Sequence, residues 1–266
     1  TASTQFTGKI IADQSVPSSS GISSHATGVA QLFYGNTGSM ASGIVEVDLY
    51  SASNWLQSGF LKAGTTQVPS ISDSRIANHS WVGALDNGQD TVTVLHRVDW
   101  LVAEDELIQV VGVNNGASPK ELLSNAFNVI GIGRTDGNHA QGTMGLDSIY
   151  TSGRSGPDLV VPFNTTSSST AVVSGSTAML IEQAQTIAEG PVAVISNGDT
   201  ITNGERSEVI KAIMMAGADR ATQNFHTTAQ ITDYRADAVN QTQNGLDGRF
   251  GAGQLNVYTN YQIMEA

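Results

Sequence analysis

The stretch LIQVVGVNNG, residues 107–116, decides the fold class of this chain. Its first seven residues contain a single polar side chain, Gln109, and then run into two asparagines and a glycine. A short run this apolar and rich in valine is typical of a strand that is buried on both faces, as strands of parallel sheets are. Polar side chains that directly follow such a strand lie at the carboxyl edge of the sheet, where open α/β sheets bind their ligands.

Similar runs lie on both sides of this stretch and alternate with segments of helical periodicity. Strands are predicted at 9–12, 43–50, 75–81, 128–133 and 157–162, and helices at 21–32, 90–104, 167–189 and 205–218. Segment 192–203 fits either a β-hairpin or an irregular loop. The alternation predicts a three-layer α/β/α sandwich with a mostly parallel central sheet. Because no repeat or linker divides the chain, we expect residues 1–266 to form a single domain.

The composition excludes several classes of function. The 266 residues carry a formal charge of −12, which repels nucleic-acid phosphates and anionic lipid, so neither partner is expected. The chain has no cysteine, which excludes disulfides, zinc–thiolate sites and a cysteine nucleophile. We expect a secreted or extracellular monomer.

Four side chains at strand ends and helix starts could support acyl transfer. Asp13 ends the first strand, His25 and Ser167 begin helices, and Asn114 follows the central strand. Acyl transfer needs a hydroxyl nucleophile, an imidazole that accepts its proton and a carboxylate that orients the imidazole. A helix N-terminus also offers free N–H groups to a developing oxyanion. Taken alone, Ser167 also fits a helix cap, and Asp13 a turn cap.

The chain has five histidines, and His79 is the main rival to His25 as the base. His79 adjoins Ser80 in a predicted strand, where neighbouring side chains point to opposite faces and cannot easily cooperate. His96 falls in a helical stretch and is expected to be structural or solvated. The sequence therefore favours His25.

Several motifs resemble those of subtilisin-like serine proteases, the subtilases. TSSSTAVVSG (166–175) resembles their serine motif, and SHATGVA (24–30) is similar to their histidine motif. IIAD (10–13) resembles their aspartate strand, and VVGVNNG (110–116) the strand that delivers an oxyanion asparagine. FGAGQLNV (250–257) resembles their last glycine-rich turn and strand. The order Asp, His, Asn, Ser is the order of the family.

The resemblance implies a subtilisin-like fold and a serine endopeptidase that works through an acyl-enzyme. Ser167 is the implied nucleophile, His25 the base and Asp13 the residue that orients it. Asn114 is the implied oxyanion donor. Asn115 lies beside it, but the family places one residue between the asparagine and the glycine, which selects Asn114.

The resemblance also implies a protein or peptide substrate that binds as an extended strand. The residues implied in this binding are Ser80, Trp81, Val82, Gly112 and Val113. Trp81 fits a core residue equally well, and Val113, where the family often has glycine, would narrow the primary pocket. The chemistry needs no cofactor. Subtilases often bind structural calcium, but no carboxylate cluster in the sequence identifies its ligands.

Some positions depart from the family pattern. Thr165 replaces a glycine, Ala171 a proline and Ala26 another glycine, and the interval from Asp13 to His25 is short. We expect Thr165 to crowd the turn before the nucleophile, because β-branched residues tolerate unusual backbone angles poorly. Two alternatives remain: a catalytically impaired subtilase-like binding or scaffold module, and a Ser/Thr-rich adhesion or carbohydrate-binding domain. The strand–helix alternation disfavours the second.

Overall fold

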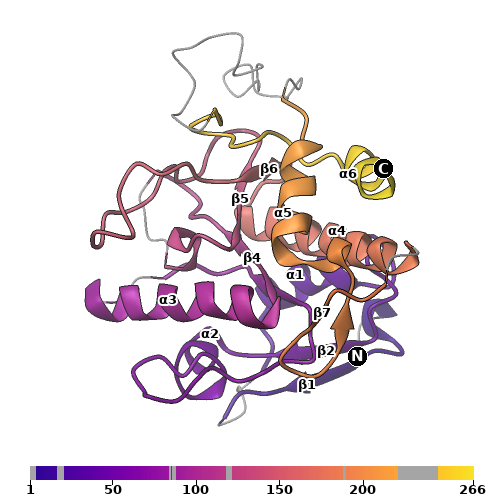
Figure 1. Ribbon diagram of the computed structural model, residues 1–266, viewed down its shortest axis with the longest axis horizontal. Coiled ribbons are helices and arrows are strands. Elements are labelled where there is room, and N and C mark those ends of the chain that lie inside the picture. Colours follow the sequence, from indigo (N-terminus) through magenta and orange to yellow (C-terminus); the bar gives the residue numbers. More distant parts are fainter. Residues whose placement is uncertain are drawn as a thin grey trace.

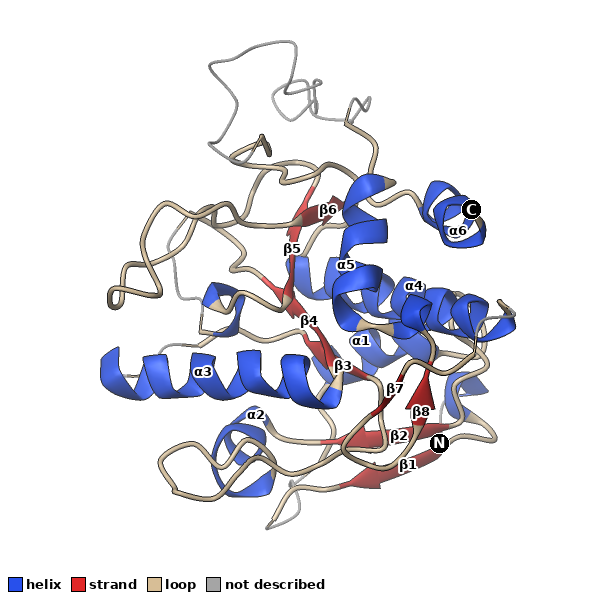
Figure 2. Ribbon diagram, viewed as in Figure 1, coloured by secondary structure: helices blue, strands red, loops and turns tan. Residues whose placement is uncertain are grey.

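A four-stranded parallel sheet lies at the centre of the computed structural model, which describes residues 4–16, 21–83, 85, 88–117, 122–187, 190–220 and 245–266. The strands follow the order β3 (Ile76–His79), β4 (Ile108–Gly112), β5 (Ile130–Arg134) and β6 (Leu159–Val161) (Figure 2). All of the pairings are parallel, and His79 lies opposite Val111. The predicted parallel sheet is confirmed.

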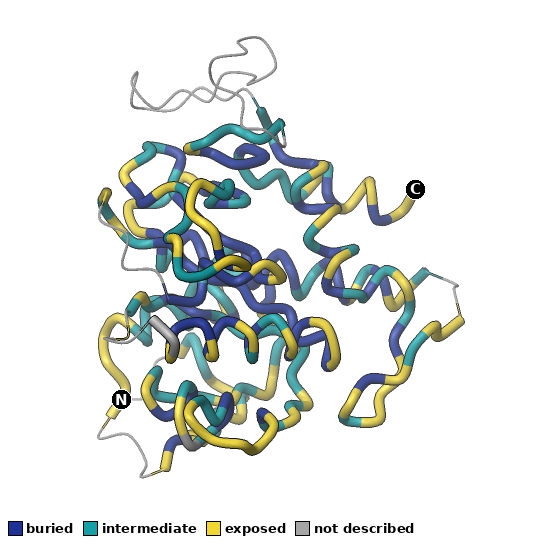
Figure 3. The backbone as a smooth tube through the Cα atoms, turned by 60° about the vertical axis from the view of Figure 1, so that its left-hand side comes forward, coloured by how far each residue is buried: buried dark blue, intermediate teal, exposed yellow. Residues whose placement is uncertain are grey.

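Helices cover both faces of this sheet. On one face, Ile108 and Val110 pack with residues of α4 (Thr166–Thr186) and α5 (Ser207–Ala216). On the other, Leu107 and Val111 pack with α3 (Gly88–Asp105). Figure 1 shows α3 on one side of the strands and α4 and α5 on the other. Strands β4 and β6 are buried along their whole length, and Figure 3 shows buried backbone in the interior of the chain, so the three-layer α/β/α architecture is confirmed.

Two further helices complete the α4 side. They are α1 (Ser24–Tyr34), which packs against α4, and α6 (Val257–Glu265), which contacts α4 and α5. Within the described residues, no helix is both long enough and apolar enough to cross a membrane.

The first two strands stand apart from the central sheet. β1 (Ile10–Asp13) and β2 (Glu46–Leu49) form a separate parallel pair in which Asp13 lies opposite Leu49. The prediction that the first strand is buried is wrong, because Ile10 is 64% exposed. Since β1 pairs with β2 alone among the described strands, neighbouring strands do not enclose it.

Helix α4 is rich in serine and threonine and is nevertheless buried. Its hydroxyl groups donate to carbonyl oxygens four residues earlier, as in the pairs Thr170 to Thr166 and Ser174 to Thr170. These bonds satisfy polar groups that would otherwise be costly to bury. Gly112 lets α4 approach β4 closely, since a Cβ atom there would lie 2.8 Å from Thr170 Oγ1. The close packing fixes the start of α4, and with it Ser167, at the carboxyl edge of the sheet.

Shorter elements complete the described chain. They are the 3₁₀ turns Thr4–Phe6, Leu123–Asn125 and Asn203–Glu205, α2 (Ala52–Asn54) with the π-helical turn Trp55–Gly59, and the antiparallel strands β7 (Ala193–Val194) and β8 (Thr200–Ile201). The hairpin alternative for 192–203 is therefore confirmed.

The strand predicted within 250–257 is wrong. Gln254 makes only isolated bridges, to Val160 and Asp219, because Gly251 and Gly253 take positive φ angles of 62° and 128° that interrupt an extended run. The chain then enters α6, whose first turn is capped by Asn256.

Candidate active site

One backbone atom, the carbonyl oxygen of Ser80, joins two of the predicted catalytic side chains. His25 Nε2 lies 3.0 Å from it, and Ser167 Oγ donates to it at 3.2 Å. The imidazole and the hydroxyl are therefore separated by no more than the sum of these two distances. They come from helices α1 and α4 and are 142 positions apart in the chain, so only the fold brings them together.

Helix caps set the positions of both groups. Ser23 accepts from Ala26 N at 3.0 Å, which starts α1 so that His25 stands in its first turn. Thr165 accepts from Ser168 N at 3.1 Å, which places Ser167 in the first turn of α4. The expectation that Thr165 crowds this turn is wrong. Its φ of −139° and ψ of 148° are ordinary extended values, and a β-branched residue adopts them readily.

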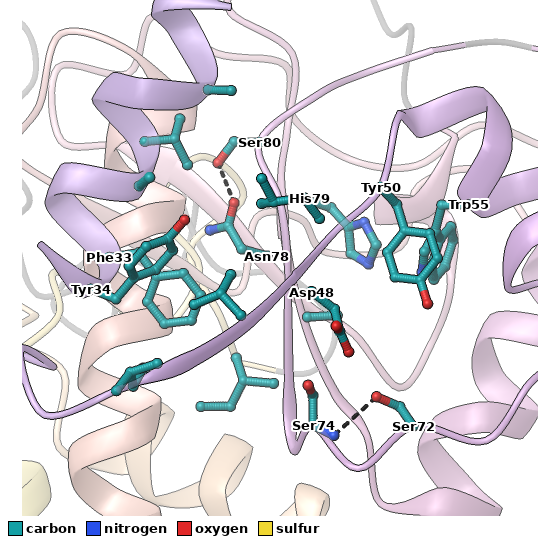
Figure 4. Close-up of a pocket in the computed structure, with 18 of the residues that line it drawn as sticks. Phe33, Tyr34, Asp48, Tyr50, Trp55, Ser72, Ser74, Asn78, His79 and Ser80 are labelled. Carbon is teal, nitrogen blue, oxygen red and sulfur yellow. Dashed lines mark hydrogen bonds between the residues drawn. The ribbon is translucent and has the colours of Figure 1, made fainter. Parts of the chain in front are cut away.

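The side chain of Ser80 ties this carbonyl to α4. Ser80 Oγ donates to Asn78 Oδ1 at 2.8 Å and to the carbonyl oxygen of Ser167 at 3.0 Å (Figure 4 shows the first bond). Asn78 in turn donates to Ser174 Oγ at 2.9 Å. Since Ser80 directly follows β3, these bonds hold the end of that strand against the start of α4.

The contact between His25 and Ser80 identifies where the imidazole carries a proton. A carbonyl oxygen only accepts hydrogen bonds, so Nε2 must be the donor. A general base needs a lone pair at the nitrogen that faces the nucleophile. In this geometry the Ser80 carbonyl oxygen accepts from both the Ser167 hydroxyl and the His25 Nε2–H, so Nε2 offers no lone pair to Ser167.

Asp13 lies at the rim of the same cleft. Its Oδ1 accepts from Ser15 N at 3.0 Å. Asp13, His25 and Ser80 all line one cavity of about 700 Å³. The Asp13 carboxylate, the His25 imidazole and Ser80 therefore all border the same cavity.

The two asparagines after β4 take different positions. Asn114 is half-buried, and its carbonyl oxygen accepts from Ala140 N at 2.9 Å. Asn115 Oδ1 accepts from Thr166 N at 2.8 Å and so anchors the first residue of α4. Sequence reasoning missed this anchoring role of Asn115, and no local pattern signals it, because the partner lies 51 residues away.

His79, the rival base, is a core residue. Its ring is buried, lies 3.0 Å from Gln109 Oε1 through Nε2, and packs with its centroid 4.5 Å from that of Trp55 and 5.7 Å from that of Trp81. Burial lowers the pKa of the His79 imidazole to about 4, so the ring is neutral near pH 7. His79 also faces away from the Ser80 hydroxyl, as expected for neighbours along a strand.

Of the remaining described histidines, His139 is buried and His96 is exposed. His139 accepts from Arg134 N through Nδ1 and contacts the Arg249 carbonyl oxygen through Nε2, and burial lowers the pKa of its ring. The His96 ring packs against Tyr150 with centroids 5.4 Å apart. The fifth histidine, His226, lies outside the residues that the structure describes.

The predicted substrate residues differ in accessibility. Val82 is 40% exposed and Trp81 is half-buried, contacting the α3-side core while also lining the cavity. Both interpretations of Trp81 therefore stand. Gly112 and Val113 are buried. No group of three or more metal-binding side chains gathers anywhere in the described part of the chain.

Comparison with known proteins identifies the fold. No family model matches the sequence, and no curated protein matches it either. Among solved structures, the patellamide maturation protease PatA is similar with a TM-score of 0.62 and 17% identity, over 99% of this chain and 92% of its own. The prenylagaramide maturation protease PagA gives a TM-score of 0.61 and 14% identity over 99% and 89%.

A structure of the subtilase cytotoxin SubAB gives a TM-score of 0.57 and 12% identity, over 97% of this chain and 83% of that one. The chain therefore has the fold of subtilisin-like proteases, as its sequence motifs predict. At these identities the likeness concerns the fold alone.

Proposed function

We propose that the protein is a serine endopeptidase with Ser167 as nucleophile, His25 as general base and Asp13 as the residue that orients His25. The observation that carries this proposal is the meeting of His25 Nε2 and Ser167 Oγ at the Ser80 carbonyl oxygen. The two side chains come from different helices and reach the same backbone oxygen. The fold is that of subtilisin-like proteases, in which a serine and a histidine are expected to act together.

Substrate binding starts the reaction by competing for the Ser80 carbonyl. An extended peptide that pairs with residues 80–83 donates a backbone N–H to this oxygen and displaces its two resting partners. The imidazole then changes tautomer: solvent water takes the proton from Nε2 and gives one to Nδ1, where Asp13 is to accept from it. Its Nε2 lone pair becomes free to accept the proton of Ser167.

The nucleophilic step follows from this arrangement. Ser167 Oγ attacks the substrate carbonyl carbon as its proton passes to His25 Nε2. The negative charge on the tetrahedral oxygen is stabilised by the Asn114 side-chain amide and by the Ser167 N–H, which lies in the first turn of α4, where backbone N–H groups have no partner within the helix. His25 then gives its proton to the leaving amine, and water resolves the acyl-enzyme with His25 again as the base.

Hydrolysis of casein or of a fluorogenic peptide tests the proposal. We expect Ser167→Ala and His25→Ala each to lower kcat by about 10⁴- to 10⁶-fold, the loss typical of this triad. Matched controls are Ser168→Ala, which removes the neighbouring hydroxyl, and His96→Ala, which removes an imidazole outside the site. These controls should keep activity within about fivefold, as surface changes do. Undiminished activity in Ser167→Ala or His25→Ala would end the assignment.

One observation favours a second candidate, a catalytically impaired binding or scaffold module. The Ser80 carbonyl holds both catalytic groups, and a protein that could not release them would bind peptides without cleaving them. Turnover by the purified protein, lost in Ser167→Ala, excludes this candidate. Binding of a peptide with no cleavage over days supports it.

A further inference from the structure

An elongated groove separates the β1–β2 pair from the central sheet. In the described chain β2 pairs only with β1, and β3 pairs only with β4, so each has one edge without a strand partner. Residues of β2 and β3 line the two sides of the cavity of about 700 Å³. This volume falls within the range of ligand clefts.

The two strands that line the groove are long enough to lie beside a short extended peptide. β2 and β3 have four residues each, which corresponds to about 13 Å of extended chain. Exposed strand edges accept such a segment as an added strand, with main-chain hydrogen bonds for affinity and alternate side chains in pockets. The outer edge of β3 continues directly into Ser80, so the groove leads to the candidate catalytic groups.

The floor of the groove is apolar. Side chains from α1, β2, β3 and α4 and from the segment before β2 contribute to it, among them Phe33, Ile44, Val47, Leu49, Ile76 and Ile181. Figure 4 shows Phe33 and Tyr34 at one side of this space and the rings of Tyr50, Trp55 and His79 at the other, with Asp48 between them. Apolar side chains of a bound peptide would therefore lose contact with water here.

The rim of the groove is acidic and lacks an available cation. The exposed carboxylates of Glu46, Asp48 and Glu182 line it. Among the lining residues Arg75 is the only lysine or arginine, and it is already held by Glu205, through a 2.8 Å bond to the carbonyl oxygen and a 3.6 Å ion pair. The net charge of the whole chain, −12, has the same sign. A positively charged partner complements this rim.

We propose that this groove binds an extended segment of the substrate polypeptide in which apolar residues alternate with lysine or arginine. The segment lies along the free edge of β3, places its apolar side chains on the floor and directs its basic side chains to Glu46, Asp48 and Glu182. This inference rests on the proposed peptidase function and specifies its substrate class.

Binding to the catalytically silent Ser167→Ala protein tests the inference without using turnover. Two labelled ten-residue peptides are titrated and followed by fluorescence anisotropy: one alternates leucine with lysine, and the other alternates leucine with glutamate. We expect the lysine peptide to bind at least about tenfold more tightly at low salt, because each exposed ion pair contributes about two- to fivefold. The difference should shrink at about 0.5 M salt, where exposed charges are screened.

A matched pair of variants locates the effect. Adding Glu46→Gln, Asp48→Asn and Glu182→Gln should remove most of the preference for the lysine peptide. The control carries Glu104→Gln, Glu208→Gln and Glu265→Gln, which change the net charge equally at residues that do not line the groove. It should keep the preference. Equal binding of both peptides, or an equal effect of both triple variants, would overturn the inference.

The failure of this inference is distinguishable from failure of the proposed function. If the protein cleaves peptides through Ser167 but binds both test peptides equally, the peptidase assignment stands and the proposed preference of the groove for basic peptides is refuted. A protein that binds the lysine peptide in the expected way but never cleaves any peptide refutes the peptidase instead.

Discussion

Replacement of His79 by glutamine should change how stability depends on pH, and the size of the change follows from burial. The pKa of His79 is about 4 in the folded protein, against about 6.5 for an exposed imidazole. Between these values the unfolded chain binds a proton that the folded protein excludes. Stability therefore falls as the pH drops from 6.5 to 4, and this contribution levels off below pH 4.

The magnitude is large enough to measure. From pH 7 to about pH 4.5, the His79 pKa difference alone removes about 2 kcal/mol from the free energy of unfolding. His79→Gln keeps an amide that can reach Gln109 but has no titrating ring. The variant should be less stable at pH 7 by about 1 kcal/mol, because the ring contacts with Trp55 and Trp81 are lost.

Urea unfolding, followed by tryptophan fluorescence at the two pH values, gives the comparison. Between pH 7 and pH 4.5 the free energy of unfolding should fall by about 2 kcal/mol more in the wild-type protein than in His79→Gln. The contributions of the carboxylates cancel in this comparison, because both proteins contain the same carboxylates. Equal losses would refute the reasoning. Peptidase activity at pH 7 should survive in His79→Gln, and its collapse to the level of His25→Ala would show that His79 is a base.

Two further substitutions examine the surroundings of the nucleophile. Asn114→Ala should lower kcat by about 10²- to 10³-fold with little change in KM, as loss of an oxyanion donor does, whereas Asn115→Ala should mainly destabilise the start of α4. Steady-state kinetics and thermal unfolding of both variants separate the two roles. A large loss of kcat in Asn115→Ala and none in Asn114→Ala would contradict this assignment. Gly112→Ala should destabilise the protein by about 1–3 kcal/mol, because the new methyl would lie 2.8 Å from Thr170 Oγ1. A chemical unfolding curve identical to that of the wild type would show that α4 is not tightly packed against β4 at Gly112.

Much of the fold could be predicted because its signals are local. The apolar run of β4 and the periodicity of α3 each lie within a single segment, and both elements form where expected. The prediction for the end of α4 is too late, because the helix stops at Thr186 and the sequence predicts it to continue to residue 189. The missed helix α6 does carry a local signal, the Asn256 side chain that caps Thr259 N.

The candidate site was predictable in part. The identities of His25 and Ser167 came from their places at helix starts and from motif order. Their meeting at the Ser80 carbonyl could not be predicted, because it depends on how α1, α4 and the end of β3 pack together. The burial of β1 was misjudged for a related reason, since an apolar strand sequence does not reveal whether a second neighbour covers it.

Labelling with a fluorophosphonate, followed by peptide mapping, tests the central claim most directly. A hydroxyl activated by His25 should form a stoichiometric adduct at Ser167, and His25→Ala should slow its formation by orders of magnitude. An adduct at another residue, or none on the folded protein even after long exposure, would contradict the account.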